Sequence, residues 1–186
     1  PLAQAQANLV ERILGRLGHL PSPQELKEAA RTHPDLLTPT RQMRAFRELE
    51  PPAEDEGFAR IERLTFARAA RGGRPGAFLA AAASVAAFDG GVTADGPHLV
   101  FDWRPDGDTD DLEALASSFR PAAEWAACMH PGGPPTCWCR PPLPGLVLDF
   151  ARRRGVDPAR SVLVGASSAH RTLANAVGAR YVDGSG

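Results

Sequence analysis

The feature that most constrains this chain is the clustering of its metal-binding side chains. All three cysteines and one of the five histidines lie within twelve residues, as Cys128, His130, Cys137 and Cys139. Three thiolates and an imidazole make a full tetrahedral ligand set for zinc, and a short Gly/Pro loop lets both arms close around one ion. Because no position stays open for an activated water, the pattern predicts a structural Zn²⁺ site. A disulfide with one spare thiol, or three free cysteines, are the alternatives, and neither explains the clustering.

The composition limits the classes of protein to consider. The 186 residues are 43% apolar and 23% charged, which suits one domain or two small ones and excludes a disordered tail. No apolar run approaches the roughly 18 residues of a membrane span, and the first residues do not resemble a signal peptide, so we expect a cytoplasmic protein without membrane contact. A net charge of −1 supplies no long-range attraction to nucleic acid, so any such contact must come from local clusters.

The first 76 residues are expected to be mostly helical. Apolar residues at helical spacing predict a helix that ends before Gly18, and Ser22 with Glu25 forms the capping box of a second helix. A third helical stretch carries Arg41, Arg44 and Arg47 on nearly one face, which is either a solvated face or a stripe that contacts phosphates.

The domain boundary is expected after this helical region. Residues 57–66 predict a strand bounded by turn residues, and the Gly-, Arg- and Pro-containing residues 70–76 predict a linker. We therefore expect a helical segment with one strand over residues 1–69 and a second domain over residues 77–186.

Beyond residue 76, short apolar runs alternate with amphipathic helices. This alternation predicts an α/β fold with a parallel sheet covered on both faces. The strands are expected at 77–82, 99–101, 125–127, 161–164 and 180–182, and the helices at 110–119, 144–154 and 169–177.

Residues 125–182 resemble the second half of a haloacid-dehalogenase-type (HAD) phosphatase. The segments C-W-C-R-P-P-L-P-G-L-V-L, G-V-D-P-A-R-S-V-L-V-G and L-A-N-A-V-G-A-R-Y-V occur in the family's order. The nearest resemblance is to heptose bisphosphate and histidinol phosphate phosphatases, in which a C-x-H…C-x-C zinc loop leads into C-R-K-P-x-P-G. The resemblance implies a HAD-like, Rossmannoid sheet with a zinc loop.

The family's catalytic groups are missing at the corresponding positions. Such phosphatases use two aspartates after the first strand, a hydroxyl after the second, a lysine near the zinc loop and an acidic pair that binds Mg²⁺. Here residues 78–84 carry alanine for both aspartates, and Asp102-Trp103-Arg104 lacks the hydroxyl. Pro141 replaces the lysine beside Arg140, and Ala166 and His170 replace the acidic pair. The resemblance therefore implies a pseudophosphatase with no catalytic residue.

A second alignment keeps one candidate nucleophile. Residues 88–93, F-D-G-G-V-T, retain Asp89 but place Gly91 where the general acid belongs, and they leave too few residues for a crossover helix before the next strand. We favour the first alignment. The second would make the chain an active phosphomonoesterase that uses Asp89 and Mg²⁺.

The acidic run from Asp106 to Asp111 is expected to be a turn and a helix start rather than a metal site.

Residues 49–61 resemble the end of the kinase domain in polynucleotide kinase 3′-phosphatases, where E-x-P-x-x-x-E-G-F-x-x-[IV] leads into a final strand. The resemblance implies that residues 1–66 are the end of a P-loop kinase lobe from a nucleic-acid repair protein. No G-x-x-x-x-G-K-[ST] occurs in the chain. We expect that motif to lie upstream of Pro1.

The leading hypothesis is a non-catalytic, zinc-stabilised module of a polynucleotide-kinase-like protein that scaffolds or recognises nucleic-acid ends or a protein partner. Two alternatives remain, the phosphomonoesterase and a protein-interaction module without a nucleic-acid role. The arginines that would contact nucleic acid are Arg41, Arg44, Arg47, Arg152, Arg153 and Arg154.

Overall fold

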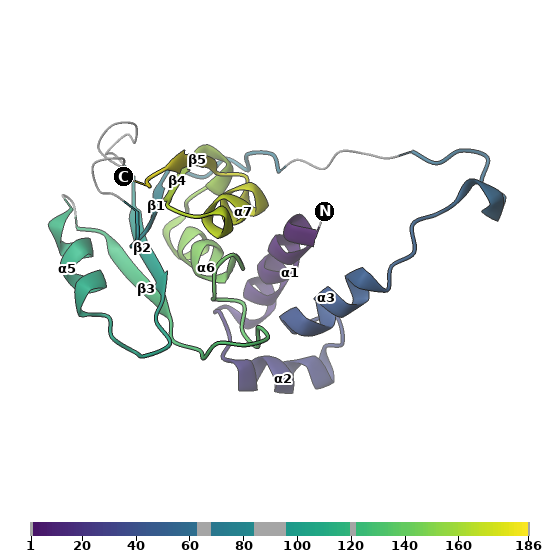
Figure 1. Cartoon of the computed structure of the whole chain (residues 1–186), viewed down its shortest axis with the longest axis horizontal. Helices are drawn as coiled ribbons and strands as arrows, with labels where there is room; N and C mark the ends of the chain where they lie inside the picture. The colour runs from purple at the N-terminus through teal and green to yellow at the C-terminus, as the bar shows by residue number, and fades with distance from the viewer. Residues whose placement is uncertain (1, 63–67, 84–95, 120–121, 186) are drawn as a thin grey trace.

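The computed structural model describes residues 2–62, 68–83, 96–119 and 122–185. A five-stranded parallel sheet with the order β3-β2-β1-β4-β5 lies between helices (Figure 1). The expected α/β class with a parallel sheet is confirmed, and the strand order is compatible with a Rossmann-like fold. The strands are β1 (Ala77–Ala80), β2 (His98–Trp103), β3 (Glu124–Cys128), β4 (Val162–Gly165) and β5 (Arg180–Asp183).

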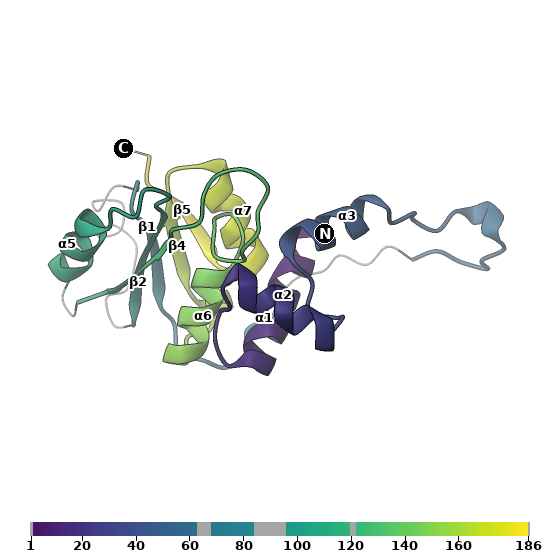
Figure 2. The same ribbon diagram turned by 90° about the horizontal axis from the view of Figure 1, so that it is seen from below.

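The two faces of the sheet bury different side chains, because successive residues of a strand point to opposite sides. On β1, Phe78 and Ala80 belong to the larger hydrophobic core, whereas Ala77 and Leu79 belong to the smaller one. The helices divide in the same way (Figure 2). The larger core receives α1 (Leu2–Leu17), α6 (Gly145–Arg154) and α7 (Ser168–Val177), and the smaller core receives α5 (Asp110–Ser118).

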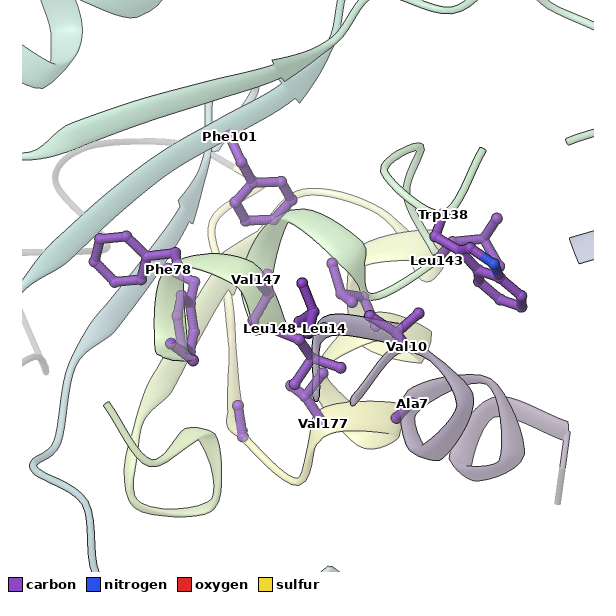
Figure 3. Close-up of a cluster of buried hydrophobic side chains, with 14 of the residues drawn as sticks. Ala7, Val10, Leu14, Phe78, Phe101, Trp138, Leu143, Val147, Leu148 and Val177 are labelled. Carbon is purple, nitrogen blue, oxygen red and sulfur yellow. The ribbon is translucent and has the colours of Figure 1, made fainter. Parts of the chain in front are cut away.

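Helix α1 is part of the larger core although about 60 residues separate it from the first strand. Ala7, Val10 and Leu14 recur at helical spacing and are buried in one cluster with Leu148 of α6 and Val177 of α7 (Figure 3). The domain boundary expected at residues 70–76 stays a prediction. In space, α1 and the sheet share one core.

The second helix begins at the cap that the sequence predicts. Glu25 donates its backbone N–H to Ser22 Oγ (3.2 Å), and Ser22 donates its own to the Glu25 carboxylate (2.8 Å), which completes the capping box. The second and third helices are α2 (Pro23–Thr32) and α3 (Pro39–Arg47). Within the described part of the chain, no helix has both the length and the apolar character to cross a membrane.

The strand predicted at residues 57–66 is wrong for residues 57–62. These residues follow a short 3-10 turn, η1 (Glu54–Glu56), and have no regular structure. A strand needs a neighbour that pairs with its backbone, and the described residues place none beside this segment. Residues 63–67 lie outside the described residues.

Asp157 holds the segment before β1 against the sheet domain. Its carboxylate is buried and accepts backbone N–H groups from Arg71, Gly72 (3.1 Å) and Ala159 (3.0 Å). Arg74 and Val156 form a parallel bridge alongside. The chain therefore enters β1 from a fixed position rather than from a free loop.

We expect Asp157→Ala to lower the free energy of unfolding by about 1–3 kcal/mol, because the backbone N–H groups of Arg71, Gly72 and Ala159 lose a buried, charged acceptor. Urea denaturation followed by circular dichroism measures the change. Asp106→Ala is the matched control, since Asp106 is exposed, and it should change the free energy by less than about 0.5 kcal/mol. Equal effects of the two substitutions would contradict this role of Asp157.

Candidate metal centre

The four expected ligands come from the end of strand β3 and from the loop that follows it. Cys128 is the last residue of β3 and His130 follows two residues later. Cys137 and Cys139 lie in the second half of the loop, before α6. Arg140 closes the loop, because its guanidinium donates to the carbonyl oxygens of Pro131 (3.1 Å) and Gly133 (2.5 Å). Hydrogen bonds within the loop thus bring its first and second halves together.

The ligand atoms converge on one point. Cys128 Sγ lies 3.6 Å from Cys137 Sγ and 3.2 Å from Cys139 Sγ, and His130 Nδ1 lies 3.2 Å from Cys139 Sγ. All four ligand atoms lie within 4.8 Å of one another. A tetrahedral ion with metal–sulfur bonds of about 2.3 Å needs sulfur atoms about 3.8 Å apart. The four residues can therefore hold one metal ion, and the donor set is compatible with zinc.

The sulfur distances also decide between the alternatives for the cysteines. A disulfide requires sulfur atoms about 2.05 Å apart, and all three cysteines are free. They are also buried. Three free buried thiols at these distances repel one another once ionised, so the arrangement fits a cation at its centre better than it fits three inert thiols.

The protonation of the thiols follows from their mutual contact. Hydrogen bonds with Cys128 and Cys139 lower the pKa of Cys137, whereas hydrogen bonds with Cys128 and Cys137 raise the pKa of Cys139. The hydrogen bond with Cys137 also raises the pKa of Cys128. A bound metal ion would take all three cysteines as thiolates and displace their protons.

Two tryptophans hold the loop from outside. Trp103, at the end of β2, donates its indole N–H to the carbonyl oxygen of His130 (2.8 Å), and the Arg140 guanidinium lies 5.3 Å from its ring centroid. Trp138 is buried between two ligands in the sequence and donates to the carbonyl oxygen of Leu37 (3.2 Å). Sequence analysis missed both roles. The role of Trp103 follows from the strand register, which pairs Trp103 with Cys128. That register exists only in the folded sheet.

The carboxyl edge of the sheet carries the positions of the expected phosphatase motifs. Ala81 and Ala83 follow β1, and Ala166 follows β4, at the point where the strand order reverses. Asp102 at the end of β2 forms an ion pair with Arg104 (2.9 Å). Ser84 and Asp89 lie outside the described residues.

His170 is buried at this same edge and is held as a neutral imidazole. Its Nδ1 accepts the backbone N–H of Ala166 (3.2 Å), its ring packs edge-on against Phe101, and burial lowers its pKa. Because Nδ1 is an acceptor, the proton of the neutral ring lies on Nε2. The His170 side chain therefore acts as a hydrogen-bond acceptor for the loop after β4.

The acidic run from Asp106 to Asp111 belongs to the start of α5. Asp108 accepts the backbone N–H of Asp110 (3.3 Å), and Asp111 forms an ion pair with Arg104 (2.5 Å). In the described ranges, the only group of side chains placed to hold a metal ion is the Cys/His cluster. The expected helix start is confirmed.

The six expected nucleic-acid arginines divide into two groups. Arg153 pairs with Asp149 (2.9 Å) and Glu124 (2.8 Å), Arg154 pairs with Glu124, and Arg44 pairs with Glu48 (2.7 Å). Arg41, Arg47 and Arg152 have no acidic partner among the described residues. Half of the expected positive charge is therefore compensated within the chain.

We expect the purified protein to carry one equivalent of zinc, measured by elemental analysis. Cys137→Ser should lose the metal and lower the free energy of unfolding by more than about 3 kcal/mol, because a buried ligand of the cluster is removed. His19→Gln, which changes an exposed histidine outside the cluster, should keep both the metal and the stability. Less than half an equivalent of zinc, or unchanged stability after chelation, would contradict the prediction.

Comparison with protein-family models, with curated proteins and with solved structures gives no match for this chain. The resemblances of residues 125–182 and 49–61 to known families therefore stay predictions from their motifs. The metal cluster and the sheet edge are described by their own geometry, and the function follows from what these two features can do chemically.

Proposed function

We propose that residues 77–186 form a non-catalytic, HAD-like domain whose fold is held by a structural zinc ion and which serves as a scaffold for nucleic-acid ends or a protein partner. The observation that carries this proposal is a contrast within one domain. The loop after β3 has a complete ligand set, while the ends of β1 and β4 have no carboxylate among the described residues.

The ligand set supports a structural ion rather than a catalytic one. Zinc that activates water keeps one coordination position open, whereas Cys128, His130, Cys137 and Cys139 supply four protein ligands. The ion would then join the edge strand β3 to the loop that leads into α6. It supplies charge that offsets three thiolates and does not take part in a reaction.

The sheet edge supports the loss of phosphatase chemistry. An aspartyl nucleophile belongs after the central strand, where Ala81 and Ala83 lie, and acids that bind Mg²⁺ belong after β4, where Ala166 and His170 lie. Alanine can neither attack phosphorus nor bind a cation. A neutral His170 that accepts a backbone N–H contributes no negative charge for Mg²⁺.

The part of the proposal that concerns nucleic acid rests on few arginines. Arg41, Arg47 and Arg152 are exposed and lack acidic partners among the described residues. Their charges are available to phosphates, whereas those of Arg153 and Arg154 are compensated by Glu124 and Asp149. The contact surface is small, so a nucleic-acid complex would be weak.

We expect no turnover of para-nitrophenyl phosphate or of 3′-phosphorylated oligonucleotides in the presence of Mg²⁺, because the carboxylates of the reaction are absent. Release of inorganic phosphate measures this. The decisive variant is Asp89→Asn. Turnover by the original chain that this substitution abolishes would overturn the proposal in favour of the phosphomonoesterase.

We expect weak binding to phosphorylated oligonucleotides at low salt, with a log–log salt slope of about −2 to −4, because few phosphates are contacted. Fluorescence anisotropy measures the affinity. Arg47→Gln and Arg152→Gln should each reduce the slope by about 1. Arg153→Gln is the matched control and should leave the slope unchanged, since Arg153 is already paired. No binding at low salt would favour the protein-interaction module.

A further inference from the structure

A long exposed arm leaves the body of the protein after helix α3. We call residues 48–62 the arm, and both views show it extending away from the sheet and from the other helices (Figures 1 and 2). Every residue from 44 to 60 is exposed. Among the described residues, the only polar contacts between the arm and the rest of the chain join Glu48 to Arg44: Arg44 donates to the Glu48 carboxylate, and Glu48 donates its backbone N–H to the Arg44 carbonyl oxygen. The arm therefore has no docking site on its own protomer in the described structure.

Apolar side chains are concentrated on the arm and on the end of the helix before it. Phe46 is 43% exposed, Leu49 69% and Phe58 54%. These are three of the six large exposed hydrophobic residues in the described structure, and they lie within thirteen residues of one another along the chain. Apolar side chains gathered in this way indicate a surface that a protein partner covers.

The same region carries its charges in two separate blocks. Helix α3 has Arg41, Arg44 and Arg47 and no acidic residue. Residues 48–56 have five acidic residues and no basic one, namely Glu48, Glu50, Glu54, Asp55 and Glu56. The exposed apolar side chains of Phe46 and Leu49 lie at the junction of the two blocks.

Within one chain, few of the positive charges of α3 form ion pairs with the negative charges of residues 48–56. Arg44 and Glu48 form the only ion pair between them in the described residues, because they are one helical turn apart. The acids of η1 lie farther along the arm, and Glu56 accepts the backbone N–H of Ala53 (3.3 Å). A second molecule can bring the unpaired charges of opposite sign together, which the chain does not do alone.

We propose that the partner of this surface is a second copy of the chain, bound in a two-fold symmetric dimer. In such an interface the same patch faces itself in the opposite direction, so a basic block followed by an acidic block is complementary to its own copy. The basic face of α3 in one protomer lies against Glu54, Asp55 and Glu56 of the other. Phe46, Leu49 and Phe58 are buried between the two arms.

This dimer does not depend on zinc scaffolding or on nucleic-acid binding. It uses charge complementarity and exposed apolar area of residues 41–58, and it forms without nucleic acid. Its only shared residues with the nucleic-acid hypothesis are Arg41, Arg44 and Arg47. A measurement in the absence of nucleic acid therefore tests the dimer separately.

Light scattering coupled to gel filtration at low salt should give twice the 19.8 kDa mass of one chain. The dissociation constant, from sedimentation equilibrium, should rise at least tenfold when the salt concentration is raised, because the paired charges are screened. Leu49→Ser with Phe58→Ser should also weaken the dimer at least tenfold. A chain that is monomeric at low salt up to about 0.1 mM would overturn the proposal and leave the arm to a different partner.

A charge exchange gives the sharpest test. One variant replaces Arg41, Arg44 and Arg47 by Glu, and the other replaces Glu54, Asp55 and Glu56 by Arg. Each variant alone should be monomeric, because like charges then face each other, and a mixture of the two should form a one-to-one dimer. Lys27→Glu with Arg31→Glu on exposed positions of α2 is the control and should stay dimeric. Dimers of either variant alone, or a mixture that stays monomeric, would contradict the proposed interface.

Discussion

The convergence of four ligand side chains after β3 is the constraint on which the rest of this structure depends. Cys128, His130, Cys137 and Cys139 fold the loop back on itself and set where α6 begins. At the start of α6, residue 145 lies so close to the Trp138 carbonyl that a side chain would overlap it, so only glycine fits. A loop rich in proline and glycine has too little apolar surface to hold this shape alone, which is why a metal ion is the natural organiser.

The same loop joins parts of the chain that are distant in sequence. Trp103 reaches it from the sheet, and Trp138 reaches from it to Leu37, in the turn between α2 and α3. The N-terminal helices are therefore attached to the sheet domain through two contacts in addition to the ion pairs of Glu11 with Arg68 and Arg71. One is the apolar face of α1, and the other is the metal-binding loop.

The described ends of β1 and β4, between which the strand order reverses, carry no carboxylate. In a parallel sheet with this strand order, ligands bind beside the ends of the two strands at which the order reverses. Here those ends carry alanines and a neutral His170, and the nearby Asp102 is paired with Arg104. The absence of a carboxylate at the described ends of β1 and β4 agrees with the proposed scaffolding role.

The sequence by itself determined the features that depend on neighbouring residues: the capping box of Ser22 and Glu25, the positions of the apolar runs and amphipathic helices, and four metal ligands within twelve residues. Their physical cause is local, because backbone caps, apolar periodicity and a short loop need no distant partner. Only the tertiary structure decided that α1 packs on α6 and α7, that Arg153 and Arg154 are neutralised by Glu124, and that residues 57–62 form no strand. These outcomes depend on which segments meet in space, and no local pattern specifies a partner 29 or more residues away.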